Sequence, residues 1–368
     1  MTRPKTKEPF VRISKRASIS LWEAGLIRIV GALLALVVCG LIIFALTGLN
    51  PIKVYGAMFK GAFGTNKRMW VTIRDMVMLL CIGVGLVPAF KMRFWNIGAE
   101  GQVLVGGIMA AACMIYLGKS VPLVPLLIMM FLASALVGGC WGLIPAFFKA
   151  QWNANETLFT LMMNYIALQL TAFFVAKWEN PYGSNTVGII NQMTKAGWFP
   201  PLFGQMYALN VIVVLFLAVF MYVYLRYSKQ GYEIAVVGES ENTARYAAIN
   251  VKAVILRTMF LSGAICGIAG FIAVAGAGHT ISTSTAGGRG FIAIIVAWLA
   301  KFDSFVMILI SSVLVFLEKG AIEIASQFDL NDFVSEMITG IILFFILGSE
   351  FYINYKVHFR GGHKEAGK

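Results

Sequence analysis

Ten apolar stretches, separated by polar connections, run along the chain. A helix that crosses a membrane needs about 20 mostly apolar residues, and most of these stretches are close to that length. Strand-like alternation is absent, and backbone groups in lipid must be satisfied within a segment, so we expect helices. The pattern predicts an all-α polytopic membrane protein with about 10 transmembrane helices. The stretches are 26–46, 71–90, 97–117, 121–148, 157–176, 207–227, 253–276, 287–300, 303–320 and 333–350.

The composition supports this prediction. Of the 368 residues, 59% are hydrophobic and only 13% are charged, and the mean hydropathy is +0.80. A soluble domain carries about a quarter charged residues. The first stretch, 26–46, is longer than the roughly 7–15 apolar residues of a secretory signal. We therefore expect it to span the membrane rather than to be cleaved.

The distribution of Lys and Arg predicts the orientation. When the connections are assigned alternately to the two sides, the side of both termini receives more than twice as many of these cations, as is typical of the cytoplasmic side. We therefore expect an N-in/C-in topology, with a cytoplasmic basic segment (1–25), a transmembrane domain (26–350) and a cytoplasmic tail (351–368). The domain includes an external loop, 177–206, and a cytoplasmic loop, 226–252. Topology and contact with membrane lipid then explain the net charge of +13 without nucleic acid.

The sequence lacks the motifs of catalysis, metal binding and nucleotide binding. The five cysteines have no CxxC spacing and form no metal-ligand pattern with the three histidines. Gly118–Ser120 reads GKS but lacks the first glycine of a P-loop, and neither HExxH nor GxSxG occurs. A transport or channel subunit is therefore favoured over an enzyme, and no metal or cofactor is expected in this chain.

Polar residues beside glycines interrupt the third stretch, "FWNIGAEGQVLVGG" (94–107). Ionisable groups within a membrane are costly and are candidates for function. Asn96, Glu100 and Gln102 lie here, and glycines weaken a helix by about 1 kcal/mol each relative to alanine. One interpretation is a broken helix that lines a cavity, as in transporters. The other is a packing joint in which Glu100 caps a neighbouring helix or pairs with an arginine; both stay open.

A second glycine-rich start surrounds Arg289 in the eighth stretch. The orientation places it at the outer membrane face and the Glu100 motif at the inner face, as an inverted repeat would produce. We expect Arg74 and Asp75, near the outer end of the second stretch, to form a local pair or to snorkel. The glycine pairs 138/142 and 263/267 have the spacing of close helix packing.

The cytoplasmic loop contains "GESENTARYAAIN" (238–250). Ser240 can cap a short helix whose small residues Ala244, Ala247 and Ala248 would face a soluble partner. An interfacial helix lying among lipid headgroups is the alternative. Its acidic residues disfavour that alternative, since such helices usually present a basic polar face.

Together these segments resemble the permease family of ABC importers for sugars, nucleosides and branched-chain amino acids. The resemblance is carried in the same order by the 94–107 motif, by "NETLFTLMMNYIA" (155–167), by the 238–250 loop and by "GGRGFIAIIVAWLAKFDSF" (287–305). It covers about 70–350 and is closest to the nucleoside branch, whose binding lipoproteins are of the basic-membrane-protein type. Two departures concern the loop, where the family usually has asparagine in place of Ser240 and glycine in place of Ala248.

The resemblance implies a permease subunit in the bacterial cytoplasmic membrane that translocates nucleosides. Its partners would be a second, paralogous permease chain, a cytoplasmic ATPase that uses ATP, and an extracellular substrate-binding lipoprotein. It assigns Asn96, Glu100, Gln102, Asn164, Tyr165, Arg289 and Phe291 to the substrate path or gate. It assigns Gly238, Glu239, Ser240, Ala244, Arg245 and Ile249 to ATPase coupling. The alternatives are a simple-sugar (ribose-type) or branched-chain amino acid permease and, outside the family, a secondary transporter or a channel.

Overall fold

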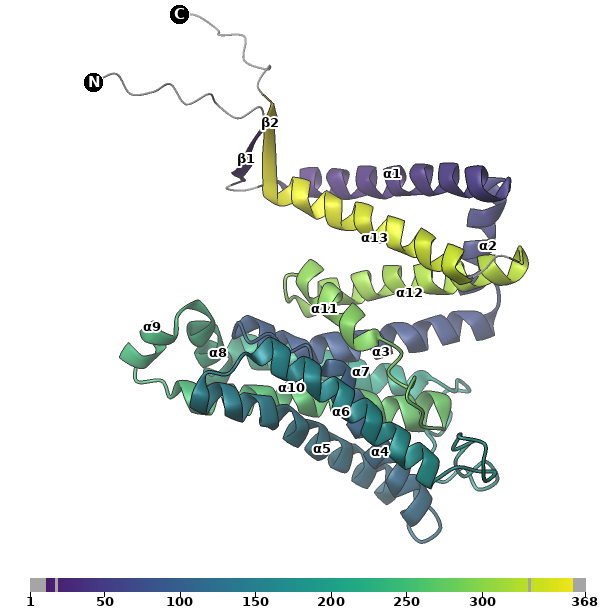
Figure 1. The fold of residues 1–368 in the computed structure, drawn as a ribbon, viewed down its shortest axis with the longest axis vertical. Coiled ribbons are helices and arrows are strands. Elements are labelled where there is room, and N and C mark those ends of the chain that lie inside the picture. Colours follow the sequence, from purple (N-terminus) through teal and green to yellow (C-terminus); the bar gives the residue numbers. More distant parts are fainter. Residues whose placement is uncertain (1–10, 17–18, 330–331, 360–368) are drawn as a thin grey trace, which may run out of the picture. The chain divides into compact units, whose positions relative to one another are not determined.

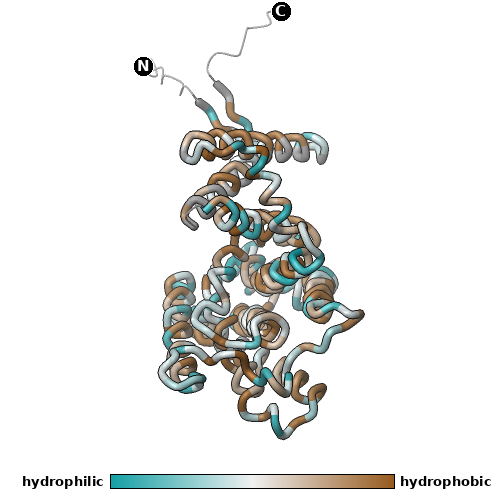
Figure 2. Tube along the Cα trace, turned by 90° about the vertical axis from the view of Figure 1, so that its right-hand side faces the viewer, coloured by the Kyte–Doolittle hydropathy of each residue, from teal (hydrophilic) through white to brown (hydrophobic). Residues whose placement is uncertain are grey.

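The computed structural model describes residues 11–16, 19–329 and 332–359, and most of this backbone is helical. The chain divides into two compact units. One is Asn66–Val315, and the other joins the segment up to Thr65 with the segment from Phe316. Hydrophobic residues predominate along the helices of both units (Figure 2).

The Asn66–Val315 unit contains most of the helices (Figure 1). Helix α10 is its centre and packs against α3, α4 and α5. Its elements are α3 (Asn66–Lys91), α4 (Ala99–Leu117), α5 (Leu123–Trp152), α6 (Glu156–Lys177), α7 (Ala208–Tyr227), α8 (Lys229–Glu239), α9 (Glu241–Tyr246), α10 (Val251–Ala273), the π-helix η1 (Val274–Gly278), α11 (Arg289–Leu299) and the first part of α12 (Ser304–Gln327).

Glycines let the central helices approach closely. A Cβ atom on Gly138 of α5 would lie 2.5 Å from the carbonyl oxygen of Gly263 in α10, and one on Gly142 would lie 2.7 Å from that of Met259. A side chain at either glycine would therefore force the helices apart. The predicted role of these glycines in helix packing is confirmed.

The other unit brings the two ends of the chain together. Its elements are β1 (Val11–Lys15), α1 (Leu21–Thr47), α2 (Pro51–Phe63), the rest of α12, α13 (Asp332–Asn354) and β2 (Tyr355–Phe359). Strands β1 and β2 pair antiparallel, with Val11 opposite Phe359. Helices α1 and α13 pack on each other, and a small core that includes Cys39, Met58 and Leu317 lies among its helices.

Every predicted apolar stretch corresponds to a helix. Within the described residues, seven helices are long and apolar enough to cross a membrane: α3, α4, α5, α6, α7, α10 with η1, and α12. The apolar part found in α1, Leu33–Ala45, and helix α11 are shorter. Helix α2 was not predicted, because its two lysines and two glycines lower its hydropathy. The terminal strands were also missed, although VRISK and YKVHF show the period-two alternation of strands.

The terminal segments of the predicted division are described only in part. Residues 1–10 and 17–18 of the 1–25 segment, and 360–368 of the 351–368 tail, lie outside the described residues. The loop 177–206 has no helix after Lys177, the last residue of α6, and it folds back on the end of η1: the ring of Trp198 stacks on that of His279 with 3.7 Å between centroids. The loop 226–252 contains α8 and α9.

Candidate functional site

The predicted break lies between α3 and α4. Helix α3 ends at Lys91, α4 begins at Ala99, and the backbone from Phe94 to Ile97 is extended or irregular. Such backbone leaves N–H and C=O groups without helical partners, which a membrane protein must satisfy by other means. The side chains around the break therefore decide whether it can exist in an apolar environment.

Three buried amides supply these partners. Asn164 of α6 accepts a hydrogen bond from the amide nitrogen of Gly101 at 2.8 Å and donates one to the carbonyl oxygen of Ile97 at 2.8 Å. Asn96 accepts from the nitrogen of Gly98 at 3.0 Å and donates to Gln102 at 3.3 Å. Asn96, Gln102 and Asn164 are only 0%, 1% and 7% exposed. These three predicted site residues therefore fix the broken backbone.

Two hydroxyl groups that the sequence reasoning missed complete this network. Thr160 of α6 accepts from the amide nitrogen of Ile97 at 3.1 Å, and Ser262 of α10 accepts from Asn96 at 3.1 Å. Both side chains are fully buried. A small hydroxyl residue in an apolar helix is a weak signal, because it can equally bond to its own helix backbone.

Glu100 caps the start of α11. Its Oε1 accepts from the nitrogen of Gly288 and its Oε2 from that of Gly290, both at 2.7 Å. A carboxylate is stabilised at a helix N-terminus by free N–H groups and by the helix dipole. Gly288 has a left-handed φ of +74°, and a Cβ on Gly290 would lie 2.5 Å from the nitrogen of Glu100. The structure thus shows Glu100 as a helix cap, and it also shows the broken helix of the first interpretation.

The two glycine-rich helix starts are in contact, so their predicted placement at opposite membrane faces is wrong. Farther along, the rings of Trp95 and Trp298 stack with 5.2 Å between centroids. Helix α11 therefore runs back along the break, while α4 continues beyond it. With 11 residues, α11 is about 16 Å long, half the thickness of the hydrocarbon core. The prediction failed because it treated 287–300 as a full span, whereas α11 is too short for one.

A polar cavity of about 200 Å³ lies beside the start of α11. Asp75 is 3% exposed, and its Oδ1 lies 2.8 Å from Nη2 of Arg74 and 3.7 Å from that of Arg289. The expected Arg74–Asp75 pair is confirmed, and Arg289 joins it rather than pairing with Glu100. The cavity is lined by Arg74, Asp75, Met78, Asn210, Ile272, Ala273, Ala277, Gly278, Thr280, Ser282, Thr285 and Arg289.

Asn210 of α7 is a cavity residue that sequence reasoning missed. It is 0% exposed, and its Nδ2 donates to the carbonyl oxygen of Gly276 at 3.0 Å. Its Oδ1 has no hydrogen-bond partner among the described residues. An asparagine in an apolar stretch was the available signal, but it has no glycine beside it in the sequence.

Tyr165 and Phe291 lie apart from this cavity. In the isolated chain their side chains are 60% and 44% exposed, and neither lines the cavity. They are surface residues of α6 and α11, respectively.

The helices of the loop 226–252, α8 and α9, pack against the region of the break. Ser240 accepts from the nitrogen of Thr243 at 3.3 Å, which confirms the predicted helix cap. Ala244 is 0% exposed and packs in a core with Phe94. The prediction of an outward-facing Ala244 is therefore wrong, because α9 turns this side toward the protein. Gly238 is buried too, where a Cβ would collide with the carbonyl oxygen of Lys91.

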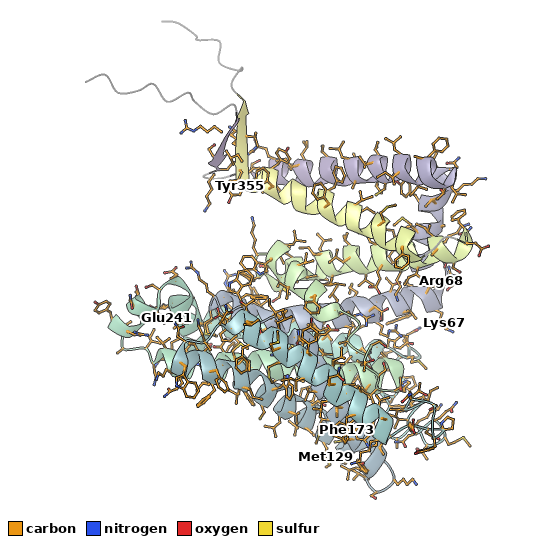
Figure 3. All side chains as sticks on the ribbon, viewed as in Figure 1. Lys67, Arg68, Met129, Phe173, Glu241 and Tyr355 are labelled. Atoms are coloured by element: carbon orange, nitrogen blue, oxygen red, sulfur yellow. The ribbon has the colours of Figure 1, made fainter. Side chains whose placement is uncertain are left out.

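The other residues of α9 and of its flanking segments are mostly exposed in the isolated chain. Glu239, Arg245, Ala247 and Ala248 are exposed, Ile249 is half-buried and Tyr246 is 94% exposed. Glu241 of α9 lies at the opposite end of this unit from Phe173 of α6 (Figure 3).

The family to which the chain belongs is now clear from comparison. The sequence profile described as "branched-chain amino acid transport system / permease component" matches residues 69–347. The guanosine ABC transporter permease protein NupP of Bacillus subtilis is 30% identical over 318 residues, which are 84% of this chain and 89% of that protein. The glucose ABC transporter permease protein TsgB13 of Haloferax volcanii is 27% identical over 358 residues, 94% and 93% of the two chains.

A third relative, the nucleoside ABC transporter permease protein NupB of Lactococcus lactis, is 27% identical over 245 residues. These are 63% of this chain and 66% of that protein. No solved structure shows a significant match. Because the profile covers well over half of the chain, the protein belongs to the family of branched-chain amino acid transport system permease components, multi-pass transport subunits of the cell membrane that are not themselves enzymes.

Proposed function

We propose that this chain is a permease subunit of an ABC importer that carries nucleosides into the cell. The observation that carries the proposal is the match to the guanosine permease, which extends over 84% of this chain. The nucleoside permease NupB supports the same substrate class. A broken helix beside a polar cavity is the arrangement in which many transporters build a solute path.

The partners follow from what this chain contains and lacks. Its sequence has no P-loop, so a separate cytoplasmic ATPase subunit would bind and hydrolyse ATP, docking on the exposed face of α9. An extracellular substrate-binding lipoprotein would deliver the solute. A second, paralogous permease chain would cover the exposed face that includes Tyr165 of α6.

The proposed topology has ten membrane crossings, with the short helix α11 forming only part of the eighth, and both termini in the cytoplasm. The antiparallel pair of β1 and β2 supports an even number of crossings, because paired strands must lie on one side of the membrane. The excess of Lys and Arg in the connections supports the cytoplasm as that side. An inverted repeat remains part of the proposal, now with the two half-helix starts meeting at Glu100 and Gly290.

The path or gate is proposed to include the buried groups that hold the two helix starts together. Asn96, Glu100, Gln102 and Asn164 would set the position of α4 and α11, and Arg289 would face the solute. Phe291 and Tyr165 would lie on the surface that contacts the second permease chain. Glu239, Arg245 and Ile249 would contact the ATPase, while the buried Ala244 and Gly238 would hold α8 and α9 in place.

A simple-sugar permease is the second candidate, and the glucose permease relative favours it, since the match covers 94% of this chain. Uptake into proteoliposomes that contain the complete transporter decides between the two. We expect labelled guanosine to accumulate only with ATP and binding protein, and excess nucleosides to compete better than glucose, ribose or leucine. Stronger competition by glucose or ribose would favour the sugar permease, and accumulation without ATP would contradict an ABC importer.

A further inference from the structure

Another half-open cavity, of about 420 Å³, lies where three apolar helices of the Asn66–Val315 unit reach the same membrane face. Helix α3 ends at Lys91, α7 ends at Tyr227 and α12 begins at Ser304. All three are long and apolar enough to cross a membrane. Because lipid headgroups flank the hydrocarbon core, a cavity at the ends of spanning helices lies at the depth of these headgroups.

The lining of this cavity carries an excess of positive charge. Three cations, Lys91, Arg226 and Lys301, line it together with one carboxylate, that of Asp303. In the part of the chain that the structure describes, neither Lys91 nor Arg226 forms an ion pair. The Oδ1 atom of Asp303 caps α12, where it accepts from two amide nitrogens at 2.9 and 3.1 Å. Like charges that gather in one cavity repel each other, so the excess favours an anion as the occupant.

Aromatic and apolar side chains beside these cations favour a lipid over a water-soluble anion. The hydroxyl of Tyr222 accepts from Nη1 of Arg226 at 2.8 Å, and its ring contacts that of Phe305 with 5.2 Å between centroids. Tyrosine is typical of the boundary between headgroups and hydrocarbon. Along α12, Phe305 and Leu309 are 58% and 67% exposed in the isolated chain. A phosphate held by the cations would therefore place its acyl chains beside exposed apolar side chains, which a free phosphate would leave uncovered.

We infer that this cavity binds the headgroup of an anionic phospholipid, with Lys91, Arg226 and Lys301 around the phosphate and the acyl chains along the start of α12. Basic pockets between membrane helices bind anionic headgroups in this way. Residues of α7, of α8 and of the turn between α11 and α12 line the cavity, so a bound headgroup would connect α8 to that turn. The site is separate from the solute path and does not depend on which solute is carried.

The test titrates phosphatidylglycerol into the purified transporter complex in a neutral detergent, and native mass spectrometry counts the bound lipid. Phosphatidylcholine, whose headgroup has no net charge, is the comparison lipid. We expect phosphatidylglycerol to bind more tightly. Arg226→Gln and Lys301→Gln should each weaken its binding about fivefold, the contribution of one cation beside anionic lipid. Both positions are exposed, so little internal packing is lost, and an unchanged melting temperature in lipid-free detergent identifies the folded variants.

Lys229→Gln is the matched control. Lys229 begins α8 and is exposed, and its replacement removes the same charge, but it does not line the cavity. Phosphatidylglycerol binding should stay within about twofold in this variant, below a fivefold step. Equal affinity for the two lipids, or unchanged affinity in both folded cavity variants, would overturn the inference, as would an equal loss in Lys229→Gln. Displacement of phosphatidylglycerol by an equal concentration of inorganic phosphate would assign the cavity to a free anion and would also overturn it.

Discussion

Glu100 and Gly290 are joined directly although 190 residues separate them: the carboxylate Oε2 of Glu100 lies 2.7 Å from the amide nitrogen of Gly290. This hydrogen bond connects the first turn of α4 to the first turn of α11. Together with the bond to Gly288, it makes the position of one half-helix depend on the other. The first two predictions concern this connection.

Replacing Glu100 with Gln should weaken the cap. The carboxamide keeps one acceptor oxygen but turns an NH2 group toward a backbone N–H, and the favourable charge at the helix start is lost. We expect a loss of about 1–3 kcal/mol of stability, seen as a lower melting temperature in nanodiscs, and reduced uptake. Glu239→Gln, at an exposed position, is the control for stability and should leave the melting temperature unchanged. Unchanged stability and uptake in Glu100→Gln would show that the cap has no role.

Replacing Gly290 with Ala should disturb the same connection from the other side. The added methyl group would lie 2.5 Å from the nitrogen of Glu100 and 2.7 Å from its Oε2, so the two helix starts must separate. Overpacking of this kind lowers the free energy of unfolding by about 1–3 kcal/mol. We expect a lower melting temperature and reduced uptake, and both can be measured. Gly56→Ala in α2 is the control, since no atom lies within 4 Å of the new methyl group. The idea fails if both alanine variants behave alike.

Tyr246 on α9 should matter for coupling and not for folding. Its side chain is 94% exposed, so Tyr246→Ala removes no internal packing. We expect a normal melting temperature, but weaker association with the ATPase and ATP hydrolysis that no longer responds to solute. Tyr182→Ala, at a 96% exposed tyrosine of the loop 177–206, should have neither effect. Normal assembly and solute-stimulated ATPase activity in Tyr246→Ala would show that α9 is not part of the docking surface for the ATPase.

Ala248 is a position where glycine should be more stable. Its φ of +56° lies in the left-handed region, which costs an L-residue with a Cβ roughly 1–2 kcal/mol. Ala248→Gly should therefore raise the stability of the cytoplasmic loop by up to about 1 kcal/mol, measured as slower proteolysis at this loop. Ala247→Gly, at a φ of −81°, should instead speed cleavage. The same response in both variants would contradict the role of backbone strain.

His279 should make stability depend on pH. Burial lowers its pKa below the usual 6.5, despite opposing contacts with backbone groups of Ala275 and Val274. The unfolded chain therefore binds more protons in this range. The stability that the neutral His279 ring contributes is fully present above about pH 6.5. It is lost as the pH falls through the lowered pKa of the folded state.

The measurement compares melting temperatures of the wild type and His279→Phe between about pH 7.5 and about pH 5. Phenylalanine keeps an aromatic ring against Trp198 but does not titrate. We expect the wild type to lose more stability on acidification than the variant. Parallel pH curves would show that His279 is not the titrating group.

The sequence predicted the helices better than their meeting points. Apolar length is a property of each stretch alone, so all ten stretches, the break before Glu100 and the cap at Ser240 could be read from neighbouring residues. The contact of Glu100 with Gly290 could not, because reading 287–300 as a complete span placed the two helix starts on opposite faces. Asn210 was missed for a similar reason, because its hydrogen-bond partner, Gly276, belongs to a helix that is distant in the sequence. Ala244 was misplaced because three alanines in one short helix do not reveal which one faces inward.

The pairing of β1 with β2 sets an order for biosynthesis. Helix α13 and strand β2 are made after Asn66–Val315, so neither the strand pair nor the packing of α1 on α13 can form before that unit has been synthesised. By then Asn66–Val315, which has its own core around α10, has been fully synthesised. Helix α1, although made earlier, must therefore wait without its partner α13, and the unit that contains both strands is completed after Asn66–Val315.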